Sequence, residues 1–411
     1  MKTIFRQLLL FVVLPCLGIH ASLACTSFII SGQATKDGRP ILLKNRDTGT
    51  LSNITVLRQG EKYRYVGIAN AKDTIANEIW GGHNEKGFAI MNTAAYNLNE
   101  KDEKLELEGV LMRRALEICA TLEDFEHLLD TLPRPLCVDA NFGVIDAQGG
   151  CAYYETGNQS YVKFDANDPA VAPEGYLVRT NHGLSGDRSR DQGVERFYAI
   201  SYFMKHTRRP FEAEHLITSV PRHLRHGLTG TDLWNNLPLS QADTTWVNFR
   251  DFIPRYITSS CLLVQGVKPG EPGERTVGWT IIGYPLTCVT VPVVITPSGH
   301  LPKVIQADEK GVSWLTTQSF RLKAQIFSLP KGSDRDYINL ARLINQEGTG
   351  IMQQLKPLED LIIAKGQKAI DRMRKDGTTT DLDNYYEWVD EFLHKKFPQK
   401  DSTKLQTKLI E

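Results

Sequence analysis

The sequence lacks a surplus of charge of either sign. Its 411 residues include 48 Lys and Arg and 48 Asp and Glu, so the formal net charge is zero. Proteins that bind nucleic acid or anionic membranes mainly through charge usually carry an excess of basic residues. The composition therefore predicts no nucleic-acid partner and no polybasic membrane contact.

Long hydrophobic runs and abundant cysteine are also absent. No apolar run approaches the roughly 20 residues that a membrane-spanning helix needs. The seven cysteines are too few for a disulfide scaffold, and none of them form the Cys-x-x-Cys spacing of a structural zinc site. With 41% hydrophobic and 23% charged residues, the chain has the composition of a folded globular protein. We expect no transmembrane segment, no metal and no cofactor.

The first 24 residues are typical of a secretory signal peptide. Lys2 and Arg6 precede an apolar stretch at residues 8–17, and residues 22–24, Ser-Leu-Ala, place small side chains at positions −3 and −1 of a cleavage site. The pattern predicts a secreted or periplasmic protein whose mature chain begins at Cys25.

Two explanations for Cys25 remain open from the start of the chain alone. A lipoprotein is also processed before a cysteine, although Ser22 stands where its signal usually has leucine. Alternatively, Cys25 is an N-terminal nucleophile that carries a thiol and a free α-amine on one residue. An α-amine has a pKa of about 7.7–8.0, which suits a general base at neutral pH.

Short strands dominate the chain after Cys25, and helices are set between them. Asp37-Gly38, between apolar runs at 26–31 and 41–44, predicts a two-residue hairpin turn. We expect no firm domain boundary within this region. The further strands predicted by their apolar and β-branched residues are 63–68, 88–92, 141–146, 152–155, 161–164, 176–179, 261–265, 276–282 and 289–295.

Helices are predicted from apolar residues at helical spacing and from a capping residue. Thr121, with Asp124 three residues later, predicts the start of a helix that runs through Leu129. From about 334 to 397 the pattern becomes helical and rich in polar residues, without strand alternation. The residues expected on the apolar sides of two other helices are Leu107, Leu111, Ala115 and Ile118, and, within a helix over 187–206, Val194, Phe197, Tyr198 and Met204.

Five short motifs follow one another in a fixed order from Cys25. They are Cys25-Thr26-Ser27, Asp37-Gly38, Lys44-Asn45-Arg46-Asp47, residues 82–92 (GHNEKGFAIMN) and Arg179-Thr180-Asn181-His182. Each motif alone is weak evidence, but the set resembles the N-terminal-nucleophile hydrolases. The likeness is closest to their linear-amide group, which includes choloylglycine hydrolases, penicillin V acylases, acid ceramidase and acyl-CoA:6-aminopenicillanate acyltransferase-like proteins. It covers residues 25–295.

The resemblance implies an α+β fold, a four-layer αββα sandwich with a C-terminal helical extension. We therefore divide the chain into a signal peptide (1–24), a catalytic domain (25–333) and a C-terminal helical layer packed on that domain (334–411). The implied activity is hydrolysis of a linear, non-peptide amide in a small molecule, through an acyl-thioester on Cys25. A homo-oligomer is compatible with the sequence.

Amide hydrolysis by a thiol needs a nucleophile, a base and donors for the oxyanion. By resemblance, Asp47 holds the α-amine of Cys25, although a turn residue before Thr48-Gly49 is its plainer role. Asn92 matches the family's oxyanion-hole asparagine, with a strand-end turn as the alternative. Asn181 matches a second asparagine that binds substrate or completes the hole, and a strand-end cap is the alternative.

Two departures put the substrate in doubt. Lys44 stands where the bile-salt and penicillin branch has an arginine, and the stretch 258–261 lacks that branch's late-strand arginine. Arg255 is nearby in sequence but has no certain alignment. A lysine keeps the charge of an arginine but not its planar fork, so bile-acid or penicillin specificity does not transfer.

We expect Lys44, Arg46 and His182 to contact the substrate. Within the enzyme class, acyl transfer to an amine and dipeptide cleavage compete with hydrolysis, because the same thioester serves all three. A lipoprotein binding module with a lipid on Cys25 is the alternative from another class.

Overall fold

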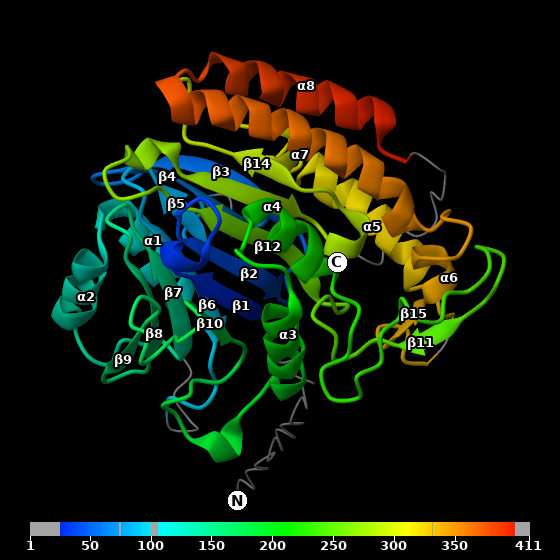
Figure 1. Cartoon of the computed structure of the whole chain (residues 1–411), viewed down its shortest axis with the longest axis horizontal. Helices are drawn as coiled ribbons and strands as arrows, with labels where there is room; N and C mark the ends of the chain where they lie inside the picture. Colours follow the sequence, from blue (N-terminus) through cyan, green and yellow to red (C-terminus); the bar gives the residue numbers. More distant parts are fainter. Residues whose placement is uncertain (1–24, 74, 100–105, 331, 399–411) are drawn as a thin grey trace, which may run out of the picture.

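Two antiparallel sheets packed face to face form the centre of the structure, and helices cover both outer faces (Figure 1). The computed structural model describes residues 25–73, 75–99, 106–330 and 332–398. This is the four-layer αββα arrangement, so the predicted α+β class and layering are confirmed. The predicted signal peptide lies outside the described residues.

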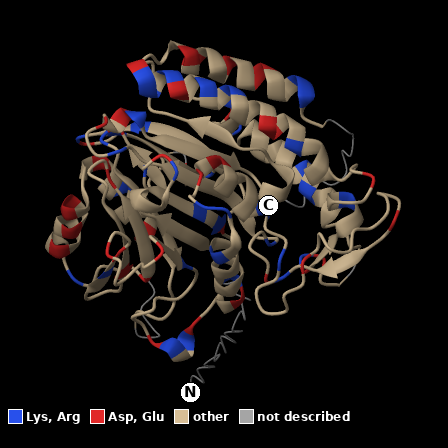
Figure 2. Cartoon of the chain, in the orientation of Figure 1, with Lys and Arg blue, Asp and Glu red and all other residues tan. Residues whose placement is uncertain are grey.

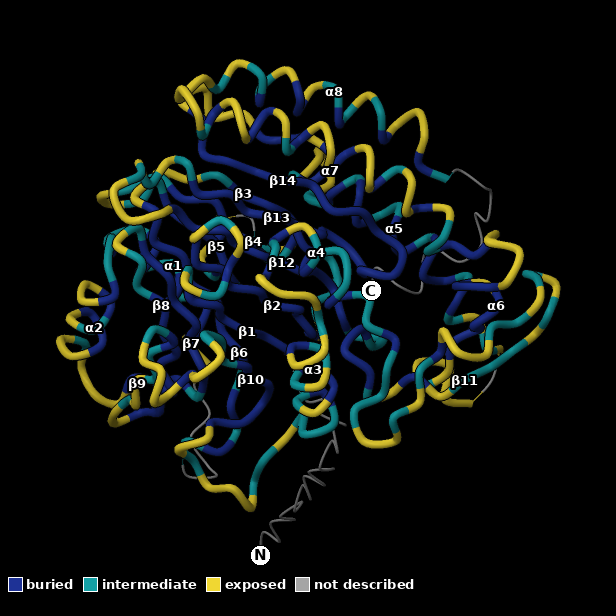
Figure 3. Tube along the Cα trace, viewed as in Figure 1, coloured by how far each residue is buried: buried dark blue, intermediate teal, exposed yellow. Residues whose placement is uncertain are grey.

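The six-stranded sheet has the order β10-β1-β2-β12-β13-β14. Because layers cover both of its faces, β1, β2, β12 and β13 are buried at every position, as the dark traces of Figure 3 show. The strands are β1 (Thr26–Ile30), β2 (Ile41–Asp47), β10 (Tyr176–Arg179), β12 (Thr258–Gln265), β13 (Val277–Ile282) and β14 (Val291–Val293).

The seven-stranded sheet follows the chain in order from β3 to β9, each strand antiparallel to the next. Its inner face packs on the six-stranded sheet, with β6 against β2. The strands are β3 (Asn53–Gln59), β4 (Arg64–Asn70), β5 (Gly82–Asn84), β6 (Ala89–Ala94), β7 (Ala140–Ile145), β8 (Cys151–Thr156) and β9 (Tyr161–Asp165).

Helices α1 (Glu108–Ile118) and α2 (Leu122–Thr131) cover the outer face of the seven-stranded sheet. The predicted start of α2 is confirmed, because Thr121 Oγ1 accepts from the Asp124 amide and the Asp124 carboxylate accepts from the Thr121 amide, both at 3.1 Å. This capping box satisfies two backbone donors that the helix itself leaves unpaired. The Phe125 ring anchors α2 against Tyr154, at 5.2 Å between centroids.

The remaining helices form the opposite outer layer and its extension. Helix α4 packs on β12 and α7 on β14, while α8 lies along α7 and both carry charges of both signs on their outer sides (Figure 2). No helix in the described part of the chain is long and apolar enough to cross a membrane. The helices are α3 (Val194–His206), α4 (Ala213–Ser219), α5 (Trp314–Ile326), α6 (Leu340–Leu343), α7 (Ile351–Asp376) and α8 (Thr380–Lys396).

Three local predictions need correction. The prediction of a two-residue turn at Asp37-Gly38 is wrong. Strands β1 and β2 do pair, but the ten residues 31–40 connect them. The backbone amide of Lys36 donates to the Phe211 carbonyl at 2.8 Å, and this contact holds the longer loop. The helix predicted from residue 187 begins at Val194. The C-terminal segment also contains a strand, β15 (Tyr337–Asn339), which pairs with β11 (Trp246–Asn248).

Candidate active site

Strand β2 presents polar side chains to two different spaces, because successive residues of a strand point to opposite faces. Lys44 and Arg46 contact residues of the seven-stranded sheet. Asn45 and Asp47 instead contact the segment 253–258, which leads into β12. One strand therefore contributes to both sides of the site.

Cys25 lies immediately before β1, next to the end of β2. The antiparallel pairing of Thr26 with Asn45 brings the two strand ends together, so Cys25 and Asp47 are neighbours although 22 residues apart in sequence. Cys25 Sγ is 3.8 Å from the Asp47 backbone oxygen, and the cysteine is 7% exposed. The structure thus brings the predicted nucleophile and the predicted amine-holding aspartate to one place.

Asp47 is a fully buried carboxylate with two strong donors. Arg255 Nε donates to Oδ2 at 2.8 Å and Thr258 Oγ1 donates to Oδ1 at 2.6 Å. Burial raises the pKa of Asp47, while the Arg255 and Arg196 guanidiniums and the Thr258 hydroxyl act in the opposite direction. Its side chain is therefore part of a network rather than a simple turn residue.

The arginine that sequence alignment could not place is Arg255. It stands three residues before β12 begins at Thr258, which is why the stretch 258–261 lacks it. A turn in which the Thr258 amide donates to the Arg255 carbonyl at 2.9 Å returns the side chain to Asp47. The partners are 208 residues apart in sequence, so only the tertiary fold joins them.

Arg196 on α3 is a site residue that the sequence analysis missed. It is 2% exposed and donates to the Cys25 carbonyl, to Thr26 Oγ1 at 3.1 Å and to Asn181 Oδ1 at 2.7 Å. Of the residues predicted on the apolar side of this helix, Met204 is buried and Phe197 packs against the core, but Tyr198 is 52% exposed. Arg196 shares the spacing of the buried Ile200, and that spacing was the available signal.

Gly193 makes room for this arginine. Its φ is +69°, in the left-handed region that suits glycine, and a Cβ there would collide with the Arg196 guanidinium. Burial lowers the pKa of Arg196 to about 10, so the group is cationic at neutral pH. The backbone carbonyl of Cys25 therefore accepts a hydrogen bond from a buried, positively charged guanidinium.

Asn181 and His182 follow β10 and differ in their surroundings. Asn181 Nδ2 donates to the Ala94 carbonyl at 2.8 Å, and its Oδ1 accepts from Arg196, so this amide links β6 to α3. The His182 ring hydrogen-bonds to the Gln192 carbonyl at 2.9 Å and packs beside Phe197. Of the two, Asn181 belongs to the network around Cys25.

Lys44 fixes the orientation of Asn92. Lys44 Nζ donates to Asn92 Oδ1 at 2.6 Å and to the Trp80 carbonyl at 2.9 Å. An ammonium can only donate, so the amide oxygen of Asn92 must face it and the amide nitrogen must point elsewhere. Within the described residues that nitrogen has no hydrogen-bond partner, as an oxyanion-hole donor requires.

The charge balance around Cys25 is strongly positive. Arg46 donates to Asn53 and, at 2.9 Å, to Asn70, and its guanidinium stacks on Trp80. Lys44, Arg46 and Arg196 are each hydrogen-bonded to neutral acceptors. Among the described residues, Arg255 is the one of these four cations that has a carboxylate partner. Burial lowers the pKa of Lys44 to about 8 and of Arg46 to about 10.

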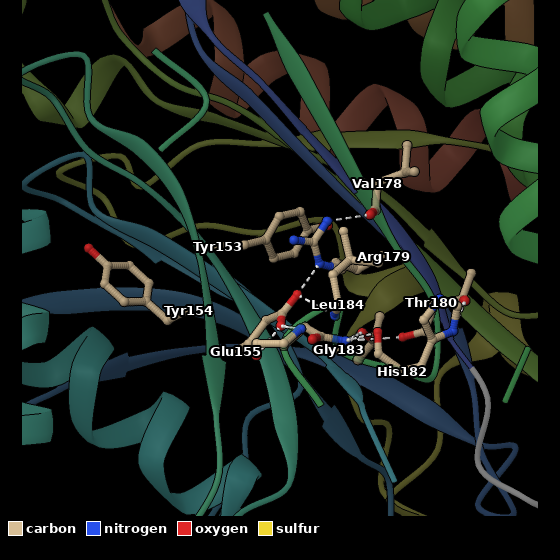
Figure 4. A network of polar contacts seen from close by, with 12 residues as sticks. Tyr153, Tyr154, Glu155, Val178, Arg179, Thr180, His182, Gly183 and Leu184 are labelled. Carbon is tan, nitrogen blue, oxygen red and sulfur yellow. Dashed lines mark hydrogen bonds and ion pairs between the residues drawn. The ribbon is translucent and has the colours of Figure 1, made fainter. Parts of the chain in front are cut away.

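A second buried network supports the segment that carries Asn181 (Figure 4). Arg179 Nε pairs with Glu155 Oε1 at 2.7 Å, and both side chains are almost fully buried. Glu155 also accepts from the amides of Leu184 and Ser185 at 2.8 and 2.7 Å. The Arg179 guanidinium packs over the Tyr153 ring. The pair therefore ties β8 to both ends of the 180–185 loop.

Removing one charge of this pair should be costly. Glu155→Gln leaves the Arg179 charge buried without its counter-ion, and breaking a buried pair typically costs about 3–5 kcal/mol. We expect a loss of that size in the free energy of unfolding, measured by urea denaturation. Lys356→Met, which removes an exposed pair with Asp360, is the control and should cost less than about 1 kcal/mol. Equal losses in the two variants would contradict the role of the buried network.

No group of three or more His, Cys, Asp or Glu side chains among the described residues could hold a metal ion. All six described cysteines are free thiols, of which Cys137 alone is not buried.

Residues 33–224 match the family model described as acyl-coenzyme A:6-aminopenicillanic acid acyl-transferase. Over this stretch, a little under half of its length, the chain is similar to that family. The match begins eight residues after Cys25, so it covers Asp47, Asn92 and Asn181 but not the cysteine itself. It also ends before Arg255 and the C-terminal helices.

Three solved structures are similar to this chain at low identity. An N-acylethanolamine-hydrolyzing acid amidase ortholog from Caenorhabditis elegans is 17% identical, with 58% of this chain and 92% of that chain covered and a TM-score of 0.38. Penicillin V acylase from Agrobacterium tumefaciens is 12% identical (66% and 87% covered, TM-score 0.34). A variant of conjugated bile acid hydrolase from Clostridium perfringens is 12% identical (66% and 92% covered, TM-score 0.37).

No curated protein sequence matches the chain. The structural scores are low, so the family model is the comparison that bears on function. The substrates named for the three solved structures are properties of those proteins.

Proposed function

We propose that this protein hydrolyses a linear, non-peptide amide through a thioester on Cys25, after cleavage of the bond between Ala24 and Cys25 frees the α-amine. The observation that carries the proposal is the position of Cys25, which lies at the junction of β1 and β2 beside the buried Asp47. The family match supports an acyl-transferring enzyme, and Cys25, Asp47 and Asn92 are the residues to which we assign the groups that such chemistry needs.

In the proposed acylation, the α-amine takes the thiol proton while Sγ attacks the carbonyl carbon of the substrate. A C–S bond forms, the C–N bond breaks, and the leaving amine receives that proton. Asp47 holds the α-ammonium, and the amide nitrogen of Asn92 donates to the oxyanion. Arg196 fixes the Cys25 backbone, so the thiol and the amine keep one relative orientation.

In the proposed deacylation, the same α-amine takes a proton from water, which attacks the thioester. The C–S bond breaks, the acid leaves and the thiol is restored. If an amine replaces water in this step, the product is a new amide, so acyl transfer uses the same residues. We propose hydrolysis because water needs no additional binding site, and we propose a secreted or periplasmic location from residues 1–24.

The surplus of positive charge suggests the first experiment. The protein from its native host is treated with iodoacetate, which is anionic, and in parallel with iodoacetamide, which is neutral. We expect a mature chain that begins at unmodified Cys25. There, the ratio of the iodoacetate to the iodoacetamide rate should exceed that at Cys137 by about tenfold, because the cations attract the anionic reagent.

Peptide mass spectrometry reads both results. A diacylglyceryl mass on Cys25, or a chain that keeps residues before it, would remove the α-amine base. Either would replace the proposed enzyme with a lipid-anchored binding protein. Equal reagent ratios at Cys25 and Cys137 would contradict the electrostatic description of the site.

A further inference from the structure

Lys323 is a fully buried lysine in the outer helical layer. It lies on α5 with 0% of its side chain exposed, and no carboxylate among the described residues is within ion-pair distance of it. Fully buried lysines are rare unless they are paired, because removing an ammonium from water is costly. A methionine would fill a similar volume without that cost, so the presence of an amine at this buried position calls for an explanation.

Aromatic rings surround the ammonium of Lys323. Its Nζ lies 4.2 Å from the centroid of Tyr256, 4.8 Å from Tyr284, 5.7 Å from Phe320 and 5.9 Å from Phe327. The faces of these rings attract a cation. Burial, aided by Arg335, lowers the pKa of Lys323 to about 7, whereas Asp47 acts in the opposite direction.

This ammonium donates a hydrogen bond to the Tyr256 carbonyl. Tyr256 follows Arg255 in the chain, and Arg255 is the residue that pairs with Asp47. A buried amine donor on α5 therefore holds the peptide next to the arginine that contacts the site.

Every carbonyl from 253 to 257 is held by a donor from elsewhere or from the turn itself. Together these contacts make residues 253–258 a strap with a fixed path. The donors are Asn45 Nδ2 to Ile253 at 3.1 Å, Tyr284 Oη to Pro254 at 3.3 Å, the Thr258 amide to Arg255 at 2.9 Å, Lys323 to Tyr256, and the Thr48 amide to Ile257 at 3.0 Å.

We propose that Lys323 is a positioning residue for the site: by holding the Tyr256 carbonyl within the aromatic ring cluster, it sets the 253–258 strap so that Arg255 meets Asp47. Asp47 and Arg255 are joined through one Nε–Oδ2 contact at 2.8 Å, and a small shift of the strap would lengthen it. The inference rests on the proposed function, in which Asp47 holds the α-amine of Cys25.

The test replaces the charge but keeps the volume. Lys323→Met should lower kcat for the amide substrate by about 10- to 100-fold, since misplacement by about 1 Å can cost that much, and should leave KM within about twofold. Lys365→Met is the matched control: Lys365 also lies 4.2 Å from an aromatic centroid, that of Trp388, but on the exposed side of α7. It should keep the wild-type kcat.

A double-mutant cycle separates positioning from general loss of stability. If Lys323 acts through Arg255, adding Lys323→Met to Arg255→Ala should change kcat no further. Additive losses would overturn the inference, because they would mean that Lys323 affects the enzyme by another route. A wild-type kcat in Lys323→Met would overturn it as well.

Failure of the proposed function is distinguishable from failure of the inference. If Cys25→Ser keeps full activity, the proposed function is wrong, whatever the kcat of Lys323→Met. The crystal structure of Lys323→Met then decides the inference without any assay. An unchanged contact between Arg255 and Asp47 overturns it, and a displaced strap supports it.

Discussion

Cys25→Ser is expected to lower kcat for amide cleavage by about 10⁴-fold or more while the protein remains folded. Loss of a nucleophile that acts as a unit with its base has effects of this order. The serine side chain is close in size to that of cysteine. The hydrogen bond from Arg196 goes to the backbone carbonyl of residue 25, so it does not depend on the side chain there. Steady-state kinetics on a panel of N-acyl amides, with thermal unfolding in parallel, measures both expectations.

Cys137→Ser is the matched control, because Cys137 is a free cysteine of intermediate burial whose thiol contacts the Pro135 carbonyl. It should retain the wild-type kcat and melting temperature. Full activity in Cys25→Ser would mean that the thiol is not the nucleophile and would end the thioester mechanism.

Asn92→Ala is expected to lower kcat by about 10²–10³-fold, the usual effect of removing one oxyanion donor. Asn92→Asp distinguishes donation from support of Lys44. The aspartate keeps an acceptor for Lys44 Nζ, now as an ion pair, but it has no amide nitrogen to donate. Asn92→Asp should therefore lose about as much kcat as Asn92→Ala. Steady-state kinetics with the N-acyl amide substrate of the Cys25→Ser test measures both losses.

If Asn92 served only to hold Lys44, Asn92→Asp would be active and Asn92→Ala would not. That result would remove Asn92 from the oxyanion hole. The two outcomes differ by at least about tenfold in kcat for Asn92→Asp, which an assay resolves easily.

The same variant has a signature in the pH dependence of stability. Lys44 has a pKa of about 8 in the folded protein and 10.5 as its ordinary value. Between these pH values the unfolded chain binds more protons, so this group makes stability rise as the pH rises from about 8 to about 10.5. The carboxylate in Asn92→Asp should raise the pKa of Lys44 and reduce that rise, as urea unfolding at several pH values would show.

Burial and charge explain why this site differs from a simple cysteine on a strand. Lys44, Arg46 and Arg196 hydrogen-bond to neutral acceptors, and none of the three forms an ion pair within the described part of the chain. A buried charge without a counter-ion is costly, and that cost is offset when an anion enters or forms beside it. The tetrahedral oxyanion of the proposed reaction is such an anion.

Several features were predictable from sequence because they depend on neighbours in the chain. The capping box of Thr121 and Asp124, the pairing of β1 with β2, and the return of Asp47 to Cys25 follow from local pattern. The turn at Asn84 is equally local, since its Oδ1 accepts from the amides of Lys86 and Phe88. The length of the loop between β1 and β2 was not predictable, because a contact with the distant residue Phe211 holds that loop.

The sequence by itself determined the order of the motifs and the meeting of Cys25 with Asp47 at two strand ends, and the family resemblance implied the four-layer class. Only the tertiary structure decided which cations surround them. Arg255 and Arg196 reach the site from 208 and 171 residues away. A buried ion pair leaves no periodic trace in sequence, since its geometry depends on how separate layers pack rather than on the spacing of residues within one element.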